Sequence, residues 1–249
     1  MQKIDRIDEE RLNDFGSRMI IIKYKSCVDI DVYFPEYNWT FEHATYNNFK
    51  KGTIKCPYER RVFGVAYIGE GKYKKHHAYY VRWYNMLKRC YDPYYINKHL
   101  TYIDVVVCDE WLNFQNFAEW LEKNYYEIPG EEMNLDKDIL IKGNKIYSSN
   151  TCCLVPQSIN KLFIKCNKSR GKYPVGVTYN KFHNKFQSQG RDCEGKHYHL
   201  GYYSTPEEAF YTYKNFKENI IKNISDKYKE YLPYNVYKAL ISYKVEIND

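Results

Sequence analysis

Alternating apolar and polar positions between residues 174 and 217 form the clearest pattern in the chain. They predict three strands, at 175–179, 185–189 and 196–203, because successive side chains of a strand point to opposite faces of a sheet. One predicted face is apolar and carries Val175, Val177, Phe186, Tyr198, Leu200 and Tyr203. The other face is basic and amide-bearing and carries Thr178, Lys185, Gln187, Gln189, His197 and His199.

A helix is predicted to cover the apolar face of this sheet. Residues 204–208 supply a capping hydroxyl, a first-turn proline and carboxylates at the positive end of the helix dipole. Apolar side chains then recur at helical spacing, at Ala209, Phe210, Tyr213, Phe216 and Ile220. The helix is expected to continue towards residue 231, where Pro233 ends it, and a short closing helix is expected within 234–245.

Residues 1–58 are predicted to form a small β module. The charged lead at 1–15 predicts a short polar helix or no regular structure, and a turn or single helical turn is expected at 46–52. Strands are expected at 19–24, 28–34, 39–45 and 53–55. The basic, glycine-rich segment 59–76 is interpreted as a linker, which either follows phosphates or serves only as a hinge.

The segment 77–164 mixes helical and extended patterns. Helices are expected at 79–91, 110–124 and 149–162. Strands are expected at 105–108, 135–140 and 145–147, with a loop at 92–101. Because the aromatic residues of the first two helices recur at helical spacing, they indicate core stripes and not a cofactor site.

Composition agrees with a folded chain of several small parts. The 249 residues are 28% charged and 44% apolar, and the mixed pattern predicts an α+β fold. The predicted parts are 1–58, 59–76, 77–164 and 165–249. The charged N-terminus lacks the apolar core of a signal peptide and no apolar run approaches a membrane span, so we expect a cytoplasmic protein without membrane contact.

The eight cysteines show no C-x-x-C spacing. Without an export signal they are interpreted as reduced thiols, because disulfides persist mainly in oxidising compartments. A zinc site built from Cys90, Cys108 and either Cys152 or Cys153 is the alternative.

Positive charge is concentrated near the predicted sheet. Between residues 161 and 203 there are nine Lys or Arg and two Asp or Glu, so the local excess equals the net charge of +7 of the whole chain. Such a concentration is typical of a surface that binds phosphate backbones. The alternative interpretation is a polar sheet face that meets only solvent.

The predicted sheet and helix resemble the DNA-binding domain of plant ethylene-response (Apetala-type) factors, which also occurs in phage homing endonucleases. The resemblance is carried by Gly176-Val177, Lys185-Phe186, His199-Leu200-Gly201, Thr205 to Ala209 and Tyr213. It implies that the open sheet face lies in the major groove of double-stranded DNA. The contacts it implies come from Thr178, Lys181, Lys185, Gln187, Gln189, Arg191, Lys196, His197 and His199. Several arginines and tryptophans of the family's reading face are replaced here by Thr, Gln and His.

The central segment resembles phage proteins of the HNH homing-endonuclease group. The matching pieces are Trp83, residues 86–91, Cys108 to Trp111, Asp136-Lys137-Asp138 and residues 151–160. The order of strand, turn, strand and helix is that of the group's ββα-metal motif. The resemblance implies a magnesium (Mg2+) site with Asp136 and Asn160 as ligands, and catalytic positions Asp136, Lys137 and Asn160.

Lys137 stands where the group has its histidine. A protonated lysine cannot take a proton from water near neutral pH, so the motif is either degenerate or only weakly active. The sequence therefore predicts a phage-type double-stranded DNA-binding protein in a bacterial host, with lost or weak nuclease activity. One alternative is an anti-CRISPR-like inhibitor that binds a host nuclease ribonucleoprotein or its guide RNA. The other is an active metal-dependent homing endonuclease.

Overall fold

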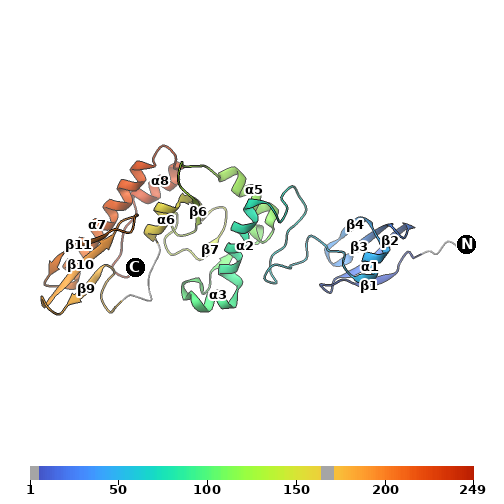
Figure 1. The fold of residues 1–249 in the computed structure, drawn as a ribbon, viewed down its shortest axis with the longest axis horizontal. Coiled ribbons are helices and arrows are strands. Elements are labelled where there is room, and N and C mark those ends of the chain that lie inside the picture. The colour runs from blue at the N-terminus through green and yellow to red at the C-terminus, as the bar shows by residue number, and fades with distance from the viewer. Residues whose placement is uncertain (1–5, 164–170) are drawn as a thin grey trace, which may run out of the picture. The chain divides into compact units, whose positions relative to one another are not determined.

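The computed structural model describes residues 6–163 and 171–249, and Figure 1 shows their ribbon. The fold is α+β, as predicted, with helices interspersed among several small sheets. Two compact units divide the chain at residues 122 and 123, inside the segment 77–164 that the sequence predicts as one part. Three of the nine cations counted above, Lys165, Lys168 and Arg170, lie outside the described residues.

Unit 1 begins with a four-stranded antiparallel meander. Its strands are β1 (Glu10–Leu12), β2 (Arg18–Ser26), β3 (Asp29–Phe34) and β4 (Trp39–Ala44). The 3-10 turn η1 (Pro35–Tyr37) connects β3 to β4, and the helix α1 (Tyr46–Lys51) follows β4. The core contains Met19, Ile21, Ile30, Val32, Phe34 and Phe49, all fully buried. Three of the four predicted strands, at 19–24, 28–34 and 39–45, and the helical turn are confirmed. The prediction for 1–15 was wrong at β1, which pairs with β2 through Arg11 and Met19.

The segment after this module is packed, not extended as a linker. No strand forms at 53–55; instead Thr53 N donates to Asn48 O at the end of α1. Gln115 Nε2 donates to Ile68 O at 3.1 Å and to Tyr73 O at 2.8 Å. Tyr73 is 4% exposed. Residues 59–76 are therefore held against the helical part of unit 1, because the half-buried Gln115 amide donates to two of their carbonyls.

The helical part of unit 1 surrounds an aromatic core. It comprises α2 (Ala78–Tyr91), α3 (Pro93–Lys98), η2 (Leu100–Tyr102), β5 (Val106–Val107), α4 (Asp109–Leu112) and α5 (Phe114–Asn124). Trp83 Nε1 donates to Trp111 O at 2.7 Å, and both side chains are buried. The predicted loop at 92–101 contains α3, which Asp92 caps. The predicted helix at 110–124 is interrupted at Asn113, whose Oδ1 accepts from Gln115 N.

Unit 2 begins with a strand pair and a helix. Strand β6 (Met133–Asp136) pairs antiparallel with β8 (Cys153–Pro156), and α6 (Gln157–Phe163) follows and packs against both strands. A short strand β7 (Ile146–Tyr147) lies in the long connection. The prediction of a helix over 149–162 was wrong for its first half. The apolar run at 153–156 is fully buried and pairs with β6, and helix begins only after Pro156.

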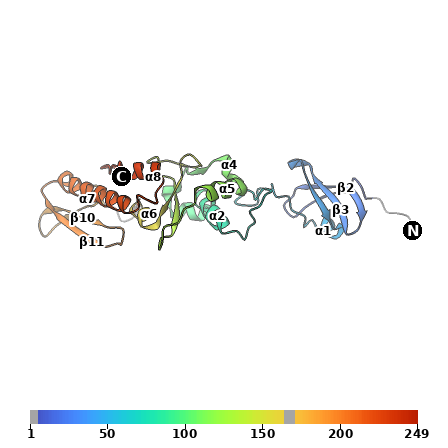
Figure 2. The same ribbon diagram turned by 90° about the horizontal axis from the view of Figure 1, so that it is seen from above.

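The predicted sheet and covering helix are confirmed in the rest of unit 2. Strands β9 (Val177–Asn180), β10 (Lys185–Arg191) and β11 (His197–Tyr203) form an antiparallel sheet in the order β11-β10-β9. Helix α7 (Pro206–Lys227) packs on all three strands (Figures 1 and 2). Its start is the predicted cap: Thr205 and Glu208 form a reciprocal capping box.

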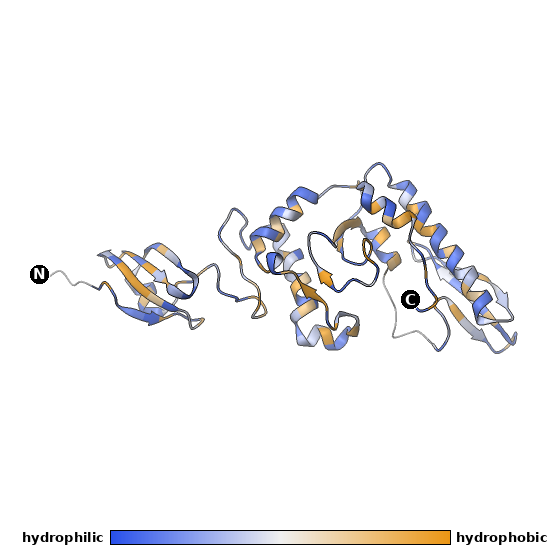
Figure 3. Cartoon of the chain, turned by 180° about the vertical axis from the view of Figure 1, so that it is seen from behind, coloured by the Kyte–Doolittle hydropathy of each residue, from blue (hydrophilic) through white to orange (hydrophobic). Residues whose placement is uncertain are grey.

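The apolar face of α7 lies against the sheet. Apolar segments recur along the helix in Figure 3, and the core here contains Val177, Ala209, Phe210 and Val245. The closing helix α8 (Tyr234–Ile241) is also present. No helix of the described residues is long and apolar enough to cross a membrane.

Candidate nucleic-acid interface

The face of the β9–β11 sheet opposite α7 is here called the outer face. Its strand residues are Thr178, Asn180, Lys185, Gln187, Gln189, Arg191, His197, His199 and Tyr202. All of them are exposed or half-buried. Backbone register places Gln187 between Thr178 and Tyr202, Gln189 opposite His199, and Arg191 opposite His197. The seven predicted strand contacts therefore share one surface.

Polar side chains of the outer face are paired across the strands. Gln187 Nε2 lies 3.2 Å from His199 Nδ1, and His197 Nε2 lies 3.2 Å from Gln189 Oε1. Asn180 Nδ2 donates to Gln187 Oε1 at 3.4 Å. These contacts hold the two amides in place before a ligand arrives, which lowers the entropy lost when a rotamer-rich side chain is immobilised by binding.

Cations lie at both ends of the outer face. Lys181 and Lys185 are near the β9–β10 turn, and Arg191 and Lys196 are near the β10–β11 turn. All four are exposed, and within the described part of the chain none forms an ion pair with a carboxylate. All four charged groups are therefore accessible to an anionic ligand, although the charge of Lys196 also helps to lower the pKa of Asp192.

Asp192, which lies in the chain between Arg191 and Lys196, is hydrogen-bonded within the protein. Asp192 Oδ1 accepts from Glu194 N at 3.0 Å and from Lys196 N at 2.9 Å, while Oδ2 accepts from Tyr198 OH at 3.0 Å. Partial desolvation acts to raise the pKa of Asp192, but these hydrogen bonds outweigh it and hold the pKa below its usual value. Asp192 thus shapes the β10–β11 turn.

Two residues of the outer face, Asn180 and Tyr202, were not among the predicted contacts. A register shift between Ser188 and Gln189 leaves Leu200 without a partner on β10 and turns Tyr202 outward and Tyr203 inward. Tyr202 then contacts the rings of His183 and His199, at centroid distances of 4.4 and 4.6 Å. Strict alternation from His197 places Tyr202 on the opposite face. The sequence signal for the bulge was Gly201, which has φ of 130°, because a glycine within a strand often marks a bulge.

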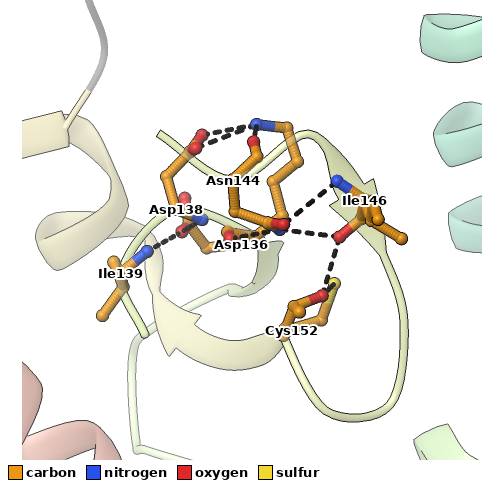
Figure 4. A network of polar contacts seen from close by, with 8 residues as sticks. Asp136, Asp138, Ile139, Asn144, Ile146 and Cys152 are labelled. Atoms are coloured by element: carbon orange, nitrogen blue, oxygen red, sulfur yellow. Dashed lines mark hydrogen bonds and ion pairs between the residues drawn. The ribbon is translucent and has the colours of Figure 1, made fainter. Parts of the chain in front are cut away.

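Two of the three residues predicted for a nuclease site, Asp136 and Lys137, lie at the end of β6 and in the hydrogen-bonded loop that follows it, and Figure 4 shows the polar contacts around Asp136. Asp136 Oδ1 accepts from Asp138 N at 2.7 Å and from Ile139 N at 2.8 Å. Lys137 is 8% exposed, and its Nζ donates to both carboxylate oxygens of Asp138 and, at 2.7 Å, to Asn144 O. Lys137 therefore clamps the connection between β6 and β7.

Among the described residues, the side chains of Asp136 and Asn160 form no hydrogen bond with each other. Burial raises the pKa of the Asp136 carboxyl, against the effect of the two N–H donors. Asn160 lies half-buried on α6, which packs against β6, but no hydrogen bond links the two side chains. Among the described residues, no group of three His, Cys, Asp or Glu side chains close enough to share a metal includes Asp136.

One such group exists elsewhere in the described residues, and it contains no cysteine. The ligand atoms of Asp29, Asp31 and His43 in unit 1 lie within 4.8 Å of one another. Lys25 Nζ lies 3.1 Å from Asp29 Oδ2 and Lys23 Nζ lies 3.3 Å from Asp31 Oδ2. Two ammonium groups balance the two carboxylates, so the cluster is satisfied as an ion-pair network.

Comparisons with family models, with curated proteins and with solved structures find no match to this chain.

Proposed function

We propose that this chain binds double-stranded DNA through the outer face of the β9–β11 sheet. The observation that carries the proposal is the array of paired amide and imidazole groups with two exposed cations at each end. Cations contact phosphates and fix the register of a protein on a duplex, while Gln and His side chains hydrogen-bond to base edges. Helix α7 covers the other face of the sheet, so the outer face is open to a ligand.

Duplex affinity is expected to fall with rising salt concentration by an amount that can be calculated. Each phosphate neutralised on a duplex contributes about 0.9 to the slope of log affinity against log salt concentration. If Lys181, Lys185, Arg191 and Lys196 each contact one phosphate, they contribute a slope of roughly −3.6. A fluorescence-anisotropy titration of a labelled random duplex at several salt concentrations measures this slope. Absence of binding at low salt would contradict the proposal. It would favour the anti-CRISPR-like alternative, in which the partner is a host nuclease ribonucleoprotein.

Charge reversal at Lys185 tests the surface directly. Lys185→Glu is expected to lower duplex affinity about tenfold at low salt and to reduce the slope by about 0.9, because one phosphate contact is lost. Lys222→Glu is the matched control, since Lys222 is exposed on α7, away from the outer face, and the change in net charge is the same. Equal effects of the two variants would show that only overall charge matters.

We further propose that the nuclease activity implied by the HNH resemblance is weak or lost in this protein. Lys137 occupies the position of the expected base, and its ammonium is engaged by Asp138 and Asn144. If the protein nicks duplex DNA with magnesium, Asp136→Ala and Asp136→Asn are both expected to abolish nicking, because each removes the carboxylate charge that a metal requires. Asp136→Asn keeps an oxygen that can accept from Asp138 N and Ile139 N, so it separates loss of charge from loss of the loop. Nicking that persists in Asp136→Asn would exclude Asp136 as a ligand.

A further inference from the structure

Phe182 is the most exposed large apolar side chain of the described residues, with 90% of its surface accessible. It lies in the turn that joins β9 to β10, beside Lys181 and close to Lys185. Burying a phenylalanine side chain is favourable, and the folded chain alone does not obtain this stabilisation at position 182. The site therefore has a large apolar surface among cations, at one end of the outer face.

The turn that carries Phe182 is held by its own hydrogen bonds. Asn180 Oδ1 accepts from Phe182 N at 3.0 Å and from His183 N at 3.1 Å. At the other end of the turn, Tyr179 OH donates to Asn184 Oδ1, and Asn184 adopts a left-handed backbone with φ of 49°. Because these contacts fix the backbone, Phe182 can contact a ligand with little further ordering of the turn.

Ring contacts join Phe182 to the outer face. The ring of Phe182 meets His183 edge-on with centroids 4.9 Å apart, and His183 lies 4.4 Å from Tyr202. Tyr202 in turn lies 4.6 Å from His199, which belongs to the set of predicted DNA contacts. Phe182 is thus the terminal ring of a series that begins among those contacts, so a duplex that covers the outer face would extend over it.

We propose that Phe182 acts as a wedge that inserts between neighbouring base pairs of the bound duplex. This inference rests on the proposed function. Apolar side chains inserted at a base step unstack it partially and kink the duplex, and this unstacking costs free energy. Burial of the Phe182 ring offsets part of this cost, and Lys181 and Lys185 stay close enough in the chain to contact the flanking phosphates. The wedge selects DNA that deforms easily, because deformation energy depends on the sequence and on pairing defects.

The experiment compares two labelled duplexes of the same sequence, one fully paired and one with a central mismatch, in EDTA to prevent cleavage. The wild-type chain is expected to bind the mismatched duplex several-fold more tightly, because less unstacking energy is required. Phe182→Ala is expected to lower affinity for both duplexes, and its affinity ratio between them should fall to about one. Tyr211→Ala is the matched control, since Tyr211 is 61% exposed on α7, and its ratio should equal that of the wild type.

A second readout is the fluorescence of Phe182→Trp, which keeps a stacking ring. Its added indole signal is expected to be quenched by either duplex, relative to the wild-type chain. An unchanged ratio in Phe182→Ala, or a wild type without preference, would overturn the wedge while leaving duplex binding and the effect of Lys185→Glu intact. Failure of the wild type to bind any duplex would instead remove the proposed function, and the wedge with it.

Discussion

Replacing Gly176 with alanine is expected to destabilise unit 2 by about 3 kcal/mol. Gly176 has φ of 78°, and a left-handed backbone costs a residue with a Cβ about 1–2 kcal/mol. The added Cβ would also overlap the ring of Tyr213 on α7, and overpacking of this kind costs typically 1–3 kcal/mol. Gly176 thus allows α7 to pack closely against the start of β9.

This change should also reach the outer face, because Gly176 O accepts from Gln189 N at 2.9 Å. A shifted backbone at Gly176 moves Gln189, so duplex affinity is expected to fall in the folded Gly176→Ala protein. Two glycines serve as controls, since nothing lies within 4 Å of an added Cβ at either of them. Gly195 has φ of 87°, so Gly195→Ala reports backbone strain alone, about 1 kcal/mol. Gly171 lacks a left-handed φ, so Gly171→Ala should be nearly neutral.

Hydrogen exchange followed by mass spectrometry, as a function of urea, measures the stability of the 175–203 peptides in the full chain. All four tryptophans, Trp39, Trp83, Trp111 and Trp120, lie in unit 1, so tryptophan fluorescence monitors unfolding of that unit separately. We expect the Gly176→Ala exchange midpoint to fall and the tryptophan transition to stay in place. Equal losses for Gly176→Ala and Gly195→Ala would show that contact with Tyr213 contributes nothing.

Replacing Lys137 with alanine is expected to destabilise unit 2 by about 2 kcal/mol. The Lys137 side chain is 9% exposed, and its removal leaves Asn144 O without its donor, a loss of roughly 1–3 kcal/mol. The Asp138 carboxylate is 45% exposed, so water replaces that part of the interaction at small cost. Alanine also removes the methylene groups of the buried lysine stem.

Lys137→Met separates these contributions, because methionine retains most of the apolar stem and lacks the ammonium. We expect Lys137→Met to lose roughly 1–2 kcal/mol less than Lys137→Ala, because it retains more than one buried apolar group and a buried methylene is worth about 0.8 kcal/mol. Hydrogen exchange of peptides from 133–147 provides the measurement. A Lys137→Ala protein as stable as the wild type would show that the loop does not depend on the lysine.

The covering helix and the outer face were largely predictable from local sequence. Thr205, Pro206 and Glu208 form the expected start of α7, because a capping box needs only residues three positions apart. Strict alternation along 185–189 placed Gln187 and Gln189 on the face opposite Phe186, and their register confirms this. Within one short hairpin, side-chain direction depends on residue parity, which the sequence contains.

The secondary-structure predictions were wrong where pairing with a strand distant in sequence decided the backbone conformation. The buried run from Cys153 to Pro156 carries no periodicity that distinguishes a strand from a helix, and its partner β6 lies about 20 residues earlier. Strand β1 is exposed and polar, so no alternation marks it, and only pairing with β2 makes it extended. The role of Lys137 likewise depends on Asn144, which reaches it through the loop fold.

The sequence by itself determined the α+β class, the covering helix, the excess of positive charge and the polar composition of the outer face. Each of these follows from residue type and from spacing of two to four positions. Only the tertiary structure decided that β6 pairs with β8, that the bulge at Leu200 turns Tyr202 outward, and that Phe182 stands exposed beside the outer face. These features depend on which distant backbone groups find hydrogen-bond partners and which side chains are left without burial, and both are properties of the assembled fold.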